Sequence, residues 1–363
     1  MKAALVLANG TVFWGESLGA VGTVQGEVVF NTGMTGYQEV LTDPSYAGQI
    51  VTMTYPLMGN YGVNTEDDQS GRIQVKGFLI KEDCAAPSNW RCGSTLNEAL
   101  ASAGIIGLKG IDTRDLTKVL RVHGTLKGVI TNEVDGLEQP EVISDWAKRL
   151  QAWQPETKLV EQVTTPAAYS IPGSGPRVVV MDFGIKGNIL EHLKAKDFDL
   201  VVVPGTASAQ EILTLNPQGL FLSNGPGDPK DVPWAVETIK QLLPKLPTFA
   251  ICLGHQLTCL ALGGDTYKLK FGHRGANQPV QDLKTKRAYI TSQNHGYAVE
   301  GKSLAKTPLR ISHLNLNDNT VEGVEHRELP VFSVQYHPEA GPGPSDSVYL
   351  FDKFSELMSR GSA

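Results

Sequence analysis

The strongest candidate for chemistry is a cysteine where a predicted buried strand meets a predicted helix. Cys252 lies in the run FAICLGHQ at 249–256, with a small residue two positions away on either side. Ala250 and Gly254 allow the tight turn that raises a nucleophile above a sheet edge, as in the GxSxG pattern of hydrolases. The partial positive charge and free N–H groups of a helix N-terminus favour a thiolate. Cys252 is therefore a candidate nucleophile. A buried structural cysteine is the alternative, and we expect that role for Cys259 on the same helix face.

A nucleophilic thiol requires a base, and one is available near the end of the chain. His337 ends a predicted buried strand in the run FSVQYHPE at 332–339. Pro338 fixes φ and turns the chain out of the strand, so the carboxylate of Glu339 can point back to the imidazole. These residues then complete a Cys-His-Glu triad, in which Glu339 orients the ring and stabilises its protonated form. A surface turn is the alternative interpretation of His-Pro-Glu.

A glycine-containing loop offers backbone N–H groups to a substrate. The run LSNGPGDP at 222–229 closes another predicted buried strand, and Gly225 and Gly227 allow a close approach of the backbone. Together with the N–H of Leu253, this loop could form an oxyanion hole. In isolation it is a simple turn. Three strand ends that carry donors, nucleophile and base nevertheless match the ligand crevice of an open α/β sheet.

A mostly parallel sheet is needed to bring these segments together. Continuous apolar runs predict buried strands, and the segments between and after them predict helices. The strands are expected at 177–182, 200–203, 219–223 and 248–251, and the helices at 234–243 and 253–262. This alternation predicts an α/β domain with helices on both faces of the sheet. Further strands are expected at 309–315, 320–324 and 330–335, with a closing helix at 345–359.

The first half of the chain predicts a mixed α/β domain without a signature of chemistry. Asn9-Gly10 predicts a hairpin over residues 5–14, because the pair supplies the positive φ values of a type I′ turn. A helix is expected over 113–123, capped by Asp112 and ended by Gly124. Strands are expected at 26–31, 49–54 and 73–80. The half contains no phosphate-binding loop.

A segment rich in proline and glycine separates the halves. Four prolines and Gly173-Ser174-Gly175 interrupt every periodic pattern between residues 154 and 176. We therefore expect an N-terminal domain over 1–153, a linker over 154–176 and a C-terminal domain over 177–363.

Composition excludes several classes of protein. The 363 residues include 32 Lys+Arg and 38 Asp+Glu, a formal charge of −6, and no run of about five basic residues favours nucleic-acid binding. A hydrophobic fraction of 41% argues against disorder, and no apolar stretch of about 20 residues predicts a membrane span. Four cysteines form neither a disulfide framework nor a CxxC pair, which favours a reducing, cytoplasmic setting. The histidines show no zinc-binding spacing, so no metal is expected.

Three of these segments together resemble the signatures of class I glutamine amidotransferases. They are CLGHQ at 252–256, NGPG at 224–227 and HPE at 337–339. Within that class, four more segments resemble the small-chain family of carbamoyl-phosphate synthases: NTGMTGYQE at 31–39, LTDPSY at 41–46, GIDTR at 110–114 and SQNHGY at 292–297. The resemblance covers both halves in order. It implies an N-terminal domain that contacts a large synthetase chain and a C-terminal glutaminase domain of the amidotransferase class.

The resemblance implies hydrolysis of L-glutamine. Cys252 would attack the side-chain amide carbon, His337 would protonate the departing ammonia, and a water activated by His337 would cleave the γ-glutamyl thioester. In this family the ammonia passes to the large chain, which makes carbamoyl phosphate from bicarbonate and two ATP for arginine and pyrimidine biosynthesis. ATP and Mg are therefore expected on the large chain, and no cofactor is expected on this one.

The resemblance also implies positions that bind glutamine. They are Ser45, Gly225, Gly227, Leu253, Gln256, Asn294, Gly296 and Tyr297. Ser45 would otherwise be a turn residue, and 294–297 a hairpin turn with His295 as a structural histidine. The family often has Phe at Tyr297, so a backbone contact is expected there. Lys186 matches a family lysine after the first strand of the domain, and a solvated loop charge is its alternative.

Other functions would share the triad. The amidotransferase subunits of anthranilate or aminodeoxychorismate synthase lack a domain such as residues 1–150. A stand-alone cysteine hydrolase would release ammonia without binding a synthetase chain. A non-enzymatic scaffold would bind a partner without any need for Cys252.

Overall fold

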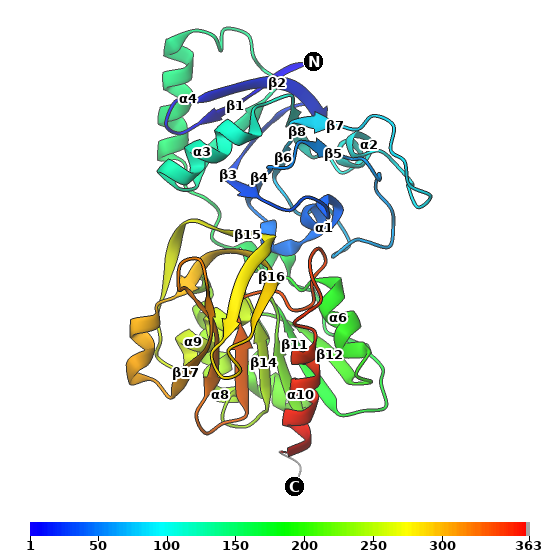
Figure 1. The fold of residues 1–363 in the computed structure, drawn as a ribbon, viewed down its shortest axis with the longest axis vertical. Coiled ribbons are helices and arrows are strands. Elements are labelled where there is room, and N and C mark those ends of the chain that lie inside the picture. The colour runs from blue at the N-terminus through cyan, green and yellow to red at the C-terminus, as the bar shows by residue number, and fades with distance from the viewer. Residues whose placement is uncertain (361–363) are drawn as a thin grey trace. The chain divides into compact units, whose positions relative to one another are not determined.

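The computed structural model describes residues 1–360, and the chain forms two compact units that meet at Glu156 and Thr157 in the sequence (Figure 1). The segment that the sequence predicts as a linker, 154–176, contributes a short helix and an edge strand to the second unit. No helix within residues 1–360 has the length and apolar character needed to cross a bilayer.

Seven strands of the first unit form a closed sheet in the order β1-β2-β8-β6-β4-β3-β9. These strands are β1 (Lys2–Leu7), β2 (Val12–Gly19), β3 (Thr23–Asn31), β4 (Gln49–Met53), β6 (Gly77–Leu79), β8 (Ile106–Lys109) and β9 (Leu126–Thr131), while β5 (Leu57–Met58) pairs with β7 (Glu82–Asp83). The helices are α1 (Tyr37–Thr42), η1 (Pro44–Tyr46), α2 (Leu96–Ser102), α3 (Thr113–His123) and α4 (Pro140–Ala152). Val29, Val51 and Phe78, from three neighbouring strands, are fully buried in one apolar cluster with residues of α1 and α2. The expected mixture of strand and helix is confirmed.

Two local elements of this unit show where the sequence signals hold. Helix α3 has the predicted bounds, with the N–H of Asp115 donating to Asp112 Oδ1 at 2.9 Å and Gly124 ending it at φ 88°. Strands β1 and β2 pair antiparallel with Val6 opposite Val12, so the hairpin is confirmed. The prediction of a type I′ turn is wrong, because Gly10 has φ 85° but Asn9 does not have a positive φ. The loop between the paired residues is longer than the two-residue loop for which that turn is favoured.

The second unit is built on a ten-stranded sheet in the order β10-β12-β11-β13-β14-β19-β18-β16-β15-β17. The strands are β10 (Tyr169–Ile171), β11 (Arg177–Asp182), β12 (Asp199–Pro204), β13 (Gly219–Leu222), β14 (Thr248–Ile251), β15 (Thr266–Asp282), β16 (Ala288–Val299), β17 (Leu309–Asn315), β18 (Val321–His326) and β19 (Val331–Val334). The helices are α5 (Leu159–Val163), α6 (Gly187–Lys194), α7 (Ala209–Thr214), η2 (Pro229–Asp231), α8 (Pro233–Leu242), α9 (Leu253–Ala261), η3 (Gly301–Lys306) and α10 (Tyr349–Arg360).

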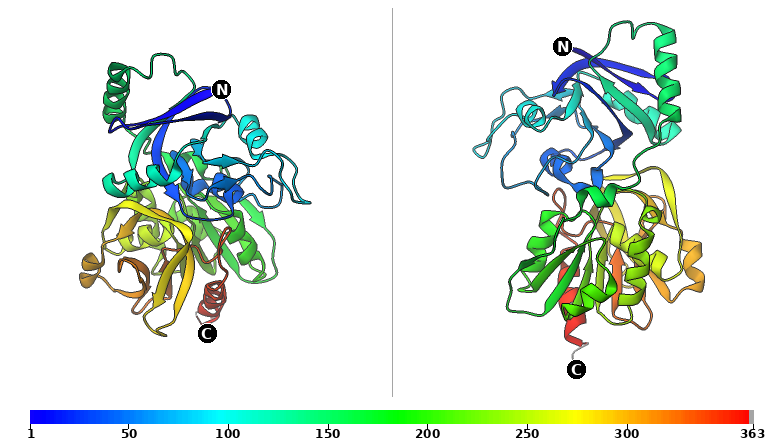
Figure 2. Two further views of the ribbon diagram at one scale, coloured as in Figure 1. Left: turned by 45° about the horizontal axis from the view of Figure 1, so that its top comes forward. Right: turned by 180° about the vertical axis from the view of Figure 1, so that it is seen from behind.

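Five neighbouring strands, β12-β11-β13-β14-β19, run parallel and form the centre of this sheet. Successive residues of β11 are buried on opposite faces. Val178 and Val180 pack in a cluster with residues of α6 and α10, whereas Val179 and Met181 pack in one with residues of α8 and α9. Helices therefore cover both faces, as Figure 2 shows from two further directions. The predicted α/β class and flanking helices are confirmed.

The longest pair of strands, β15 and β16, has no counterpart among the predicted elements. Gly272, Gly275 and Pro279 interrupt the polar–apolar alternation that would indicate a strand. The structure accommodates them with register shifts between Lys268 and His273 and between Gly275 and Gln278. Because these irregularities break the periodicity, a pattern of period two could not reveal the strand.

Candidate active site

The ends of four neighbouring parallel strands carry the candidate residues of the second unit. In sheet order, β11 leads to Lys186, β13 to Gly225, β14 to Cys252 and β19 to His337. Carboxyl ends of neighbouring parallel strands lie at one edge of a sheet, where open α/β sheets form their ligand crevices. The topology thus brings together residues that are far apart in the sequence.

Cys252 occupies the tight turn between β14 and α9. Its φ of 54° and ψ of −104° lie in a region that costs of the order of 1–3 kcal/mol for a residue other than glycine. The N–H of Cys252 donates to Val334 O at 2.9 Å, which ties the turn to β19. A Cβ atom on Gly254 would lie 2.5 Å from Leu222 O, so the following turn of backbone accepts only glycine. The strained strand-to-helix turn expected from the sequence is present.

The Cys252 thiol is buried against strand β16. The residue is 2% exposed, and its Sγ lies 3.6 Å from the carbonyl oxygen of Asn294. Cys259, on the same helix, is fully buried, and burial raises the pKa of its thiol. Cys252, at the N-cap of α9, and Cys259, within α9, are therefore distinguished by backbone strain and by neighbours rather than by burial.

His337 and Glu339 form a close pair beside Cys252. Nδ1 of His337 lies 2.6 Å from Oε1 of Glu339, and both residues are buried. Burial would lower the pKa of His337, but the charge of Glu339 and then the Cys252 sulfur raise it to about 10. Burial would raise the pKa of Glu339, but the charges of Lys186 and His337 lower it to about 2. Because the pair is buried, the surface-turn interpretation of His-Pro-Glu is wrong.

The other ring nitrogen of His337, Nε2, is buried but not engaged by another side chain or by the backbone among the described residues. Within residues 1–360, no group makes a hydrogen bond to Nε2 of His337. The Cys252 sulfur lies near enough to contribute to the raised pKa of this ring. With Nδ1 engaged by Glu339, the ring can exchange a proton through Nε2 with the sulfur or with a substrate group.

Lys186 supports the carboxylate of this pair. Its Nζ donates to Glu339 Oε1 at 2.9 Å and also to the carbonyl oxygen of Ala340, and the residue is 2% exposed. The interpretation as a solvated loop charge is therefore wrong. Asp182 holds the preceding loop, because its Oδ1 accepts the N–H groups of Gly184 and Ile185, each at 2.8 Å.

Several predicted glutamine-binding residues lie around the same strand ends. A Cβ on Gly225 would lie 2.4 Å from Phe183 O and 2.8 Å from Leu253 Cδ2, so this loop packs tightly against the start of α9. Leu253 is the first residue of α9, and its N–H therefore has no carbonyl partner within the helix. Gly227, on the same loop as Gly225, has φ 89°.

The remaining predicted positions of this unit lie on α9 and β16. Nε2 of Gln256 donates to Tyr297 O at 2.8 Å, which joins the helix to the strand. Asn294, Gly296 and Tyr297 lie within β16, so the hairpin-turn interpretation of these residues is wrong. His295 is buried, with Nδ1 2.8 Å from Tyr297 O and Nε2 3.0 Å from Gln293 Oε1, as a structural histidine would be.

Ser45 lies in the first unit. It belongs to η1, it is 5% exposed, and its N–H donates to Asp43 Oδ1 at 2.9 Å, which is the local structure of a turn residue. Its part in binding glutamine stays a prediction.

Two residues that contact the candidate site were missed from the sequence. Gln335 Oε1 accepts a hydrogen bond from Gln256 Nε2 at 3.0 Å, and Ser292 O accepts the N–H of His337 at 2.9 Å. Gln335 directly follows β19, two positions before His337, in a buried run whose other residues are mostly apolar. A polar side chain in such a buried run was the available signal.

Three buried side chains of the same unit have metal-binding types. The candidate ligand atoms of His273, His295 and Glu322 all lie within 4.8 Å of one another. However, Oε1 of Gln293 lies 3.1 Å from His273 Nδ1 and 3.0 Å from His295 Nε2. The amide thus joins the two rings in a hydrogen-bonded network. The absence of a metal stays a prediction.

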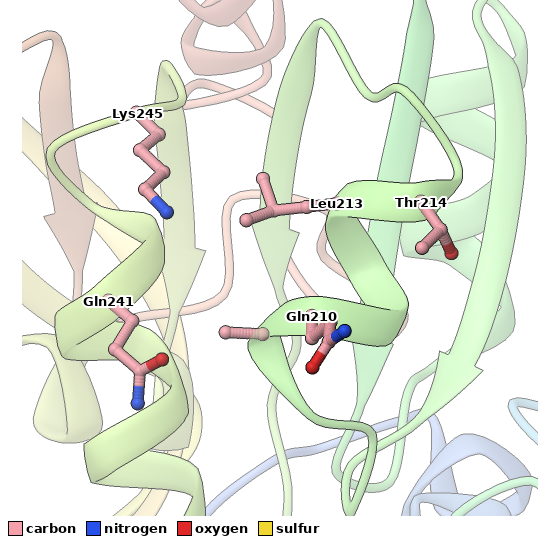
Figure 3. Close-up of a pocket in the computed structure, with 6 residues that line it drawn as sticks. Gln210, Leu213, Thr214, Gln241 and Lys245 are labelled. Atoms are coloured by element: carbon pink, nitrogen blue, oxygen red, sulfur yellow. The ribbon is translucent and has the colours of Figure 1, made fainter.

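A separate hollow of about 420 Å³ lies between α7 and α8 (Figure 3). It is lined by Ala209, Gln210, Leu213, Thr214, Gln241 and Lys245. These residues include no pairing of a nucleophile with a base, so the hollow is not a candidate for the chemistry.

Comparisons with known proteins agree with this architecture. The family description "Glutamine amidotransferase class-I" matches residues 179–357, and "Carbamoyl-phosphate synthase small chain, CPSase domain" matches residues 5–130. The second unit is therefore a glutamine amidotransferase domain of class I.

Relatives along the whole chain narrow the assignment. The carbamoyl phosphate synthase small chain of Bacillus caldolyticus is 54% identical over 359 residues, which cover 99% of this chain and 97% of the relative. The pyrimidine-specific small chain of Bacillus subtilis (strain 168) is 53% identical over 358 residues, covering 99% and 96%. The small chain of Syntrophotalea carbinolica is 53% identical over 377 residues, covering 99% and 98%. The chain belongs to the carbamoyl-phosphate synthase small-chain family.

Proposed function

We propose that this chain hydrolyses L-glutamine through Cys252, His337 and Glu339 and delivers the ammonia to a large synthetase chain. The observation that carries the proposal is the 2.6 Å contact between His337 Nδ1 and Glu339 Oε1. It leaves Nε2 of the ring available for proton exchange near the Cys252 sulfur. The match of residues 179–357 to the class-I amidotransferases supports glutamine as the substrate.

The first half-reaction forms a thioester. The Cys252 sulfur attacks the side-chain amide carbon of glutamine, and the carbonyl oxygen becomes an oxyanion. The N–H groups of Leu253 and the Gly225–Gly227 loop stabilise that charge, as donors fixed in advance do in other acyl transfers. His337, which is protonated because Glu339 and the sulfur raise its pKa, gives its proton to the departing nitrogen, so ammonia leaves.

The second half-reaction releases glutamate. Neutral His337 takes a proton from a water molecule, and the resulting hydroxide attacks the γ-glutamyl thioester. The sulfur leaves and His337 is again protonated beside it. Glu339 keeps the ring oriented through both steps, and Lys186 keeps Glu339 ionised and in place.

The remaining parts of the proposal concern glutamine binding and the partner. Gln256, Asn294, Gly296 and Tyr297, with Ser45 of the first unit, bind the substrate. The first unit contacts the large chain, which carries ATP and Mg and makes carbamoyl phosphate from bicarbonate and two ATP for arginine and pyrimidine biosynthesis. Direct delivery matters because ammonia in neutral water becomes largely ammonium, which has no lone pair for attack.

The test is ammonia release from glutamine by the purified chain, alone and with the large chain. Cys252→Ser should abolish release in both conditions, while Cys259→Ser on the same helix should retain it. Wild-type release should rise when the large chain is present, and carbamoyl phosphate should appear. Release that is unchanged by Cys252→Ser would contradict the proposed nucleophile, and release without any effect of the large chain would favour a stand-alone hydrolase.

A further inference from the structure

A polar network joins buried residues of β15, β16 and β18 to Asp318, a partly exposed residue of the turn before β18, and the catalytic steps make no use of it. His273 Nε2 lies 2.8 Å from Asp318 Oδ2, and His273 Nδ1 lies 3.1 Å from Gln293 Oε1 and 3.6 Å from Glu322 Oε1. Glu322 is fully buried, and its Oε2 has no hydrogen-bond partner among the described residues.

The network carries charge. Burial would lower the pKa of His273, but hydrogen bonds with Asp318 and Glu322 raise it to about 9. Burial would raise the pKa of Asp318, but the hydrogen bond from His273 lowers it to about 2. At neutral pH, the contact between His273 and Asp318 is therefore charge-assisted, a class of hydrogen bond roughly twice as strong as one between neutral groups.

Strand β16 has few backbone pairs with β15 where it passes the candidate active site. Between the two register shifts of β15, only three residue pairs join it to β16, and they include His273 with His295 and Gly275 with Gln293. Register shifts of this kind disrupt a ladder locally and are frequent beside active sites, where they re-aim side chains. Side-chain contacts therefore have more influence on the position of β16 here than in a regular sheet.

The same short stretch of β16 carries the backbone groups that face the catalytic residues. Ser292 O accepts the N–H of His337, Asn294 O lies 3.6 Å from Cys252 Sγ, and Tyr297 O accepts Gln256 Nε2. Gln293, which contacts His273, stands between Ser292 and Asn294. A displacement of Gln293 therefore moves the peptide groups on both sides of it.

We propose that His273, held by Asp318 and Glu322, is a positioning residue that fixes residues 293–297 of β16 for glutamine binding through its contact with Gln293. This inference rests on the proposed glutaminase function. Both catalytic residues also have anchors outside β16, because the N–H of Cys252 is bonded to Val334 O and the His337 ring contacts Glu339, which Lys186 holds. Loss of the network therefore weakens substrate binding more than it slows the chemical steps.

The test measures KM and kcat for glutamine with the full chain and the large chain. His273→Ala should raise KM about tenfold while kcat changes less than about threefold, since the side chain that holds the binding segment of β16 through Gln293 is removed. His273→Gln keeps a donor toward Asp318, so its KM should lie between those of wild type and His273→Ala. Asp318→Asn should raise KM by about threefold.

A matched control separates positioning from general loss of stability. His313 is a buried histidine on β17 of the same sheet, outside the network, with Nδ1 near Ser312 Oγ. His313→Asn should lower Tm and leave KM unchanged. Wild-type KM in all the network variants, with Tm lowered as in the control, would overturn the inference.

A second readout does not depend on turnover. Alkylation of Cys252 by iodoacetamide, followed on its peptide by mass spectrometry, should proceed at the wild-type rate in the network variants, and more glutamine should be needed to protect it. Equal protection in wild type and variants would overturn the positioning role alone. A folded wild-type chain without glutamine turnover or protection would overturn both this inference and the proposed function.

Discussion

The two units of the chain use strands in contrasting ways. The sheet of the first unit closes on itself, and the strands of the second form an open sheet with a parallel centre. In the open sheet, β11, β13, β14 and β19 follow one another in parallel, so Lys186, Cys252 and His337 come after strands that end at one edge. The candidate catalytic residues therefore belong to the second unit.

The two units also differ in the charge of their buried polar side chains. In the first unit many are neutral amides and hydroxyls, such as Asn31, Gln38 and Thr52. In the second, Lys186, His337 and Glu339 form a buried set of charges. Buried charges are costly unless they are paired, so this set marks the second unit as the candidate site of proton transfer.

The largest effect should follow from removal of the base in the second unit. His337→Asn should lower kcat for glutamine hydrolysis by about 10³-fold or more, because proton transfer to the leaving nitrogen and from water is lost. The matched variant His123→Asn changes an exposed histidine of α3 in the first unit and should leave kcat unchanged. A comparable loss of kcat in both variants would contradict the assignment of the catalytic residues to the second unit.

The next effect concerns orientation of the base. Glu339→Gln should lower kcat by about 10²-fold, since the neutral amide neither stabilises the imidazolium nor selects its tautomer. Lys186→Met should have a smaller effect in the same direction, because Lys186 acts through Glu339. Steady-state kinetics at saturating glutamine would measure both, and a larger loss from Lys186→Met than from Glu339→Gln would contradict this order.

The contribution of the buried His337–Glu339 pair to the unfolding free energy should depend on pH. The pKa of His337 rises from 6.5 to about 10 in the folded chain, so the stability from its pairing is full below pH 6.5 and is lost as pH rises through 10. The difference in unfolding free energy between wild type and Glu339→Gln should therefore shrink from pH 6.5 to 10. Denaturant unfolding at several pH values measures it.

The control for this pH dependence is an exposed pair of the first unit, Lys2 with Glu138. Glu138→Gln should show a difference from wild type that stays level over the same range. If the Glu339→Gln difference is equally level, the buried pair does not titrate as described.

The smallest effect should come from a helix cap in the first unit. Asp112→Ala removes the acceptor for the N–H of Asp115 and should cost about 1 kcal/mol of unfolding free energy. Glutamine hydrolysis by the folded variant should be unchanged. A reduced kcat in the fully folded variant would show that the first unit influences the chemical steps, contrary to their assignment to the second unit.

The sequence predicted local elements best where a short-range signal had a direct physical cause. The apolar runs at 177–182 and 248–251 became buried strands, and Asp112 and Gly124 bounded α3. The strand-to-helix turn at Cys252 was also visible, because the small residues around it leave room for the strain.

Features that depend on distant contacts were harder to predict. The burial of Lys186 follows from its pairing with Glu339, which is 153 positions away, so a lysine in a loop gave no sign of it. The β15–β16 ribbon contains register shifts that break its alternation. The network around His273 joins β15, β16 and β18, and it depends on that unpredicted ribbon.

The central claim is that Cys252 forms a covalent γ-glutamyl intermediate. The most direct test is to quench the wild-type chain in acid during turnover of glutamine with the large chain and to map the adduct by mass spectrometry. The account predicts a glutamyl group on the peptide that contains Cys252. An adduct on another residue, or turnover with no adduct on Cys252 under any quench, would contradict it.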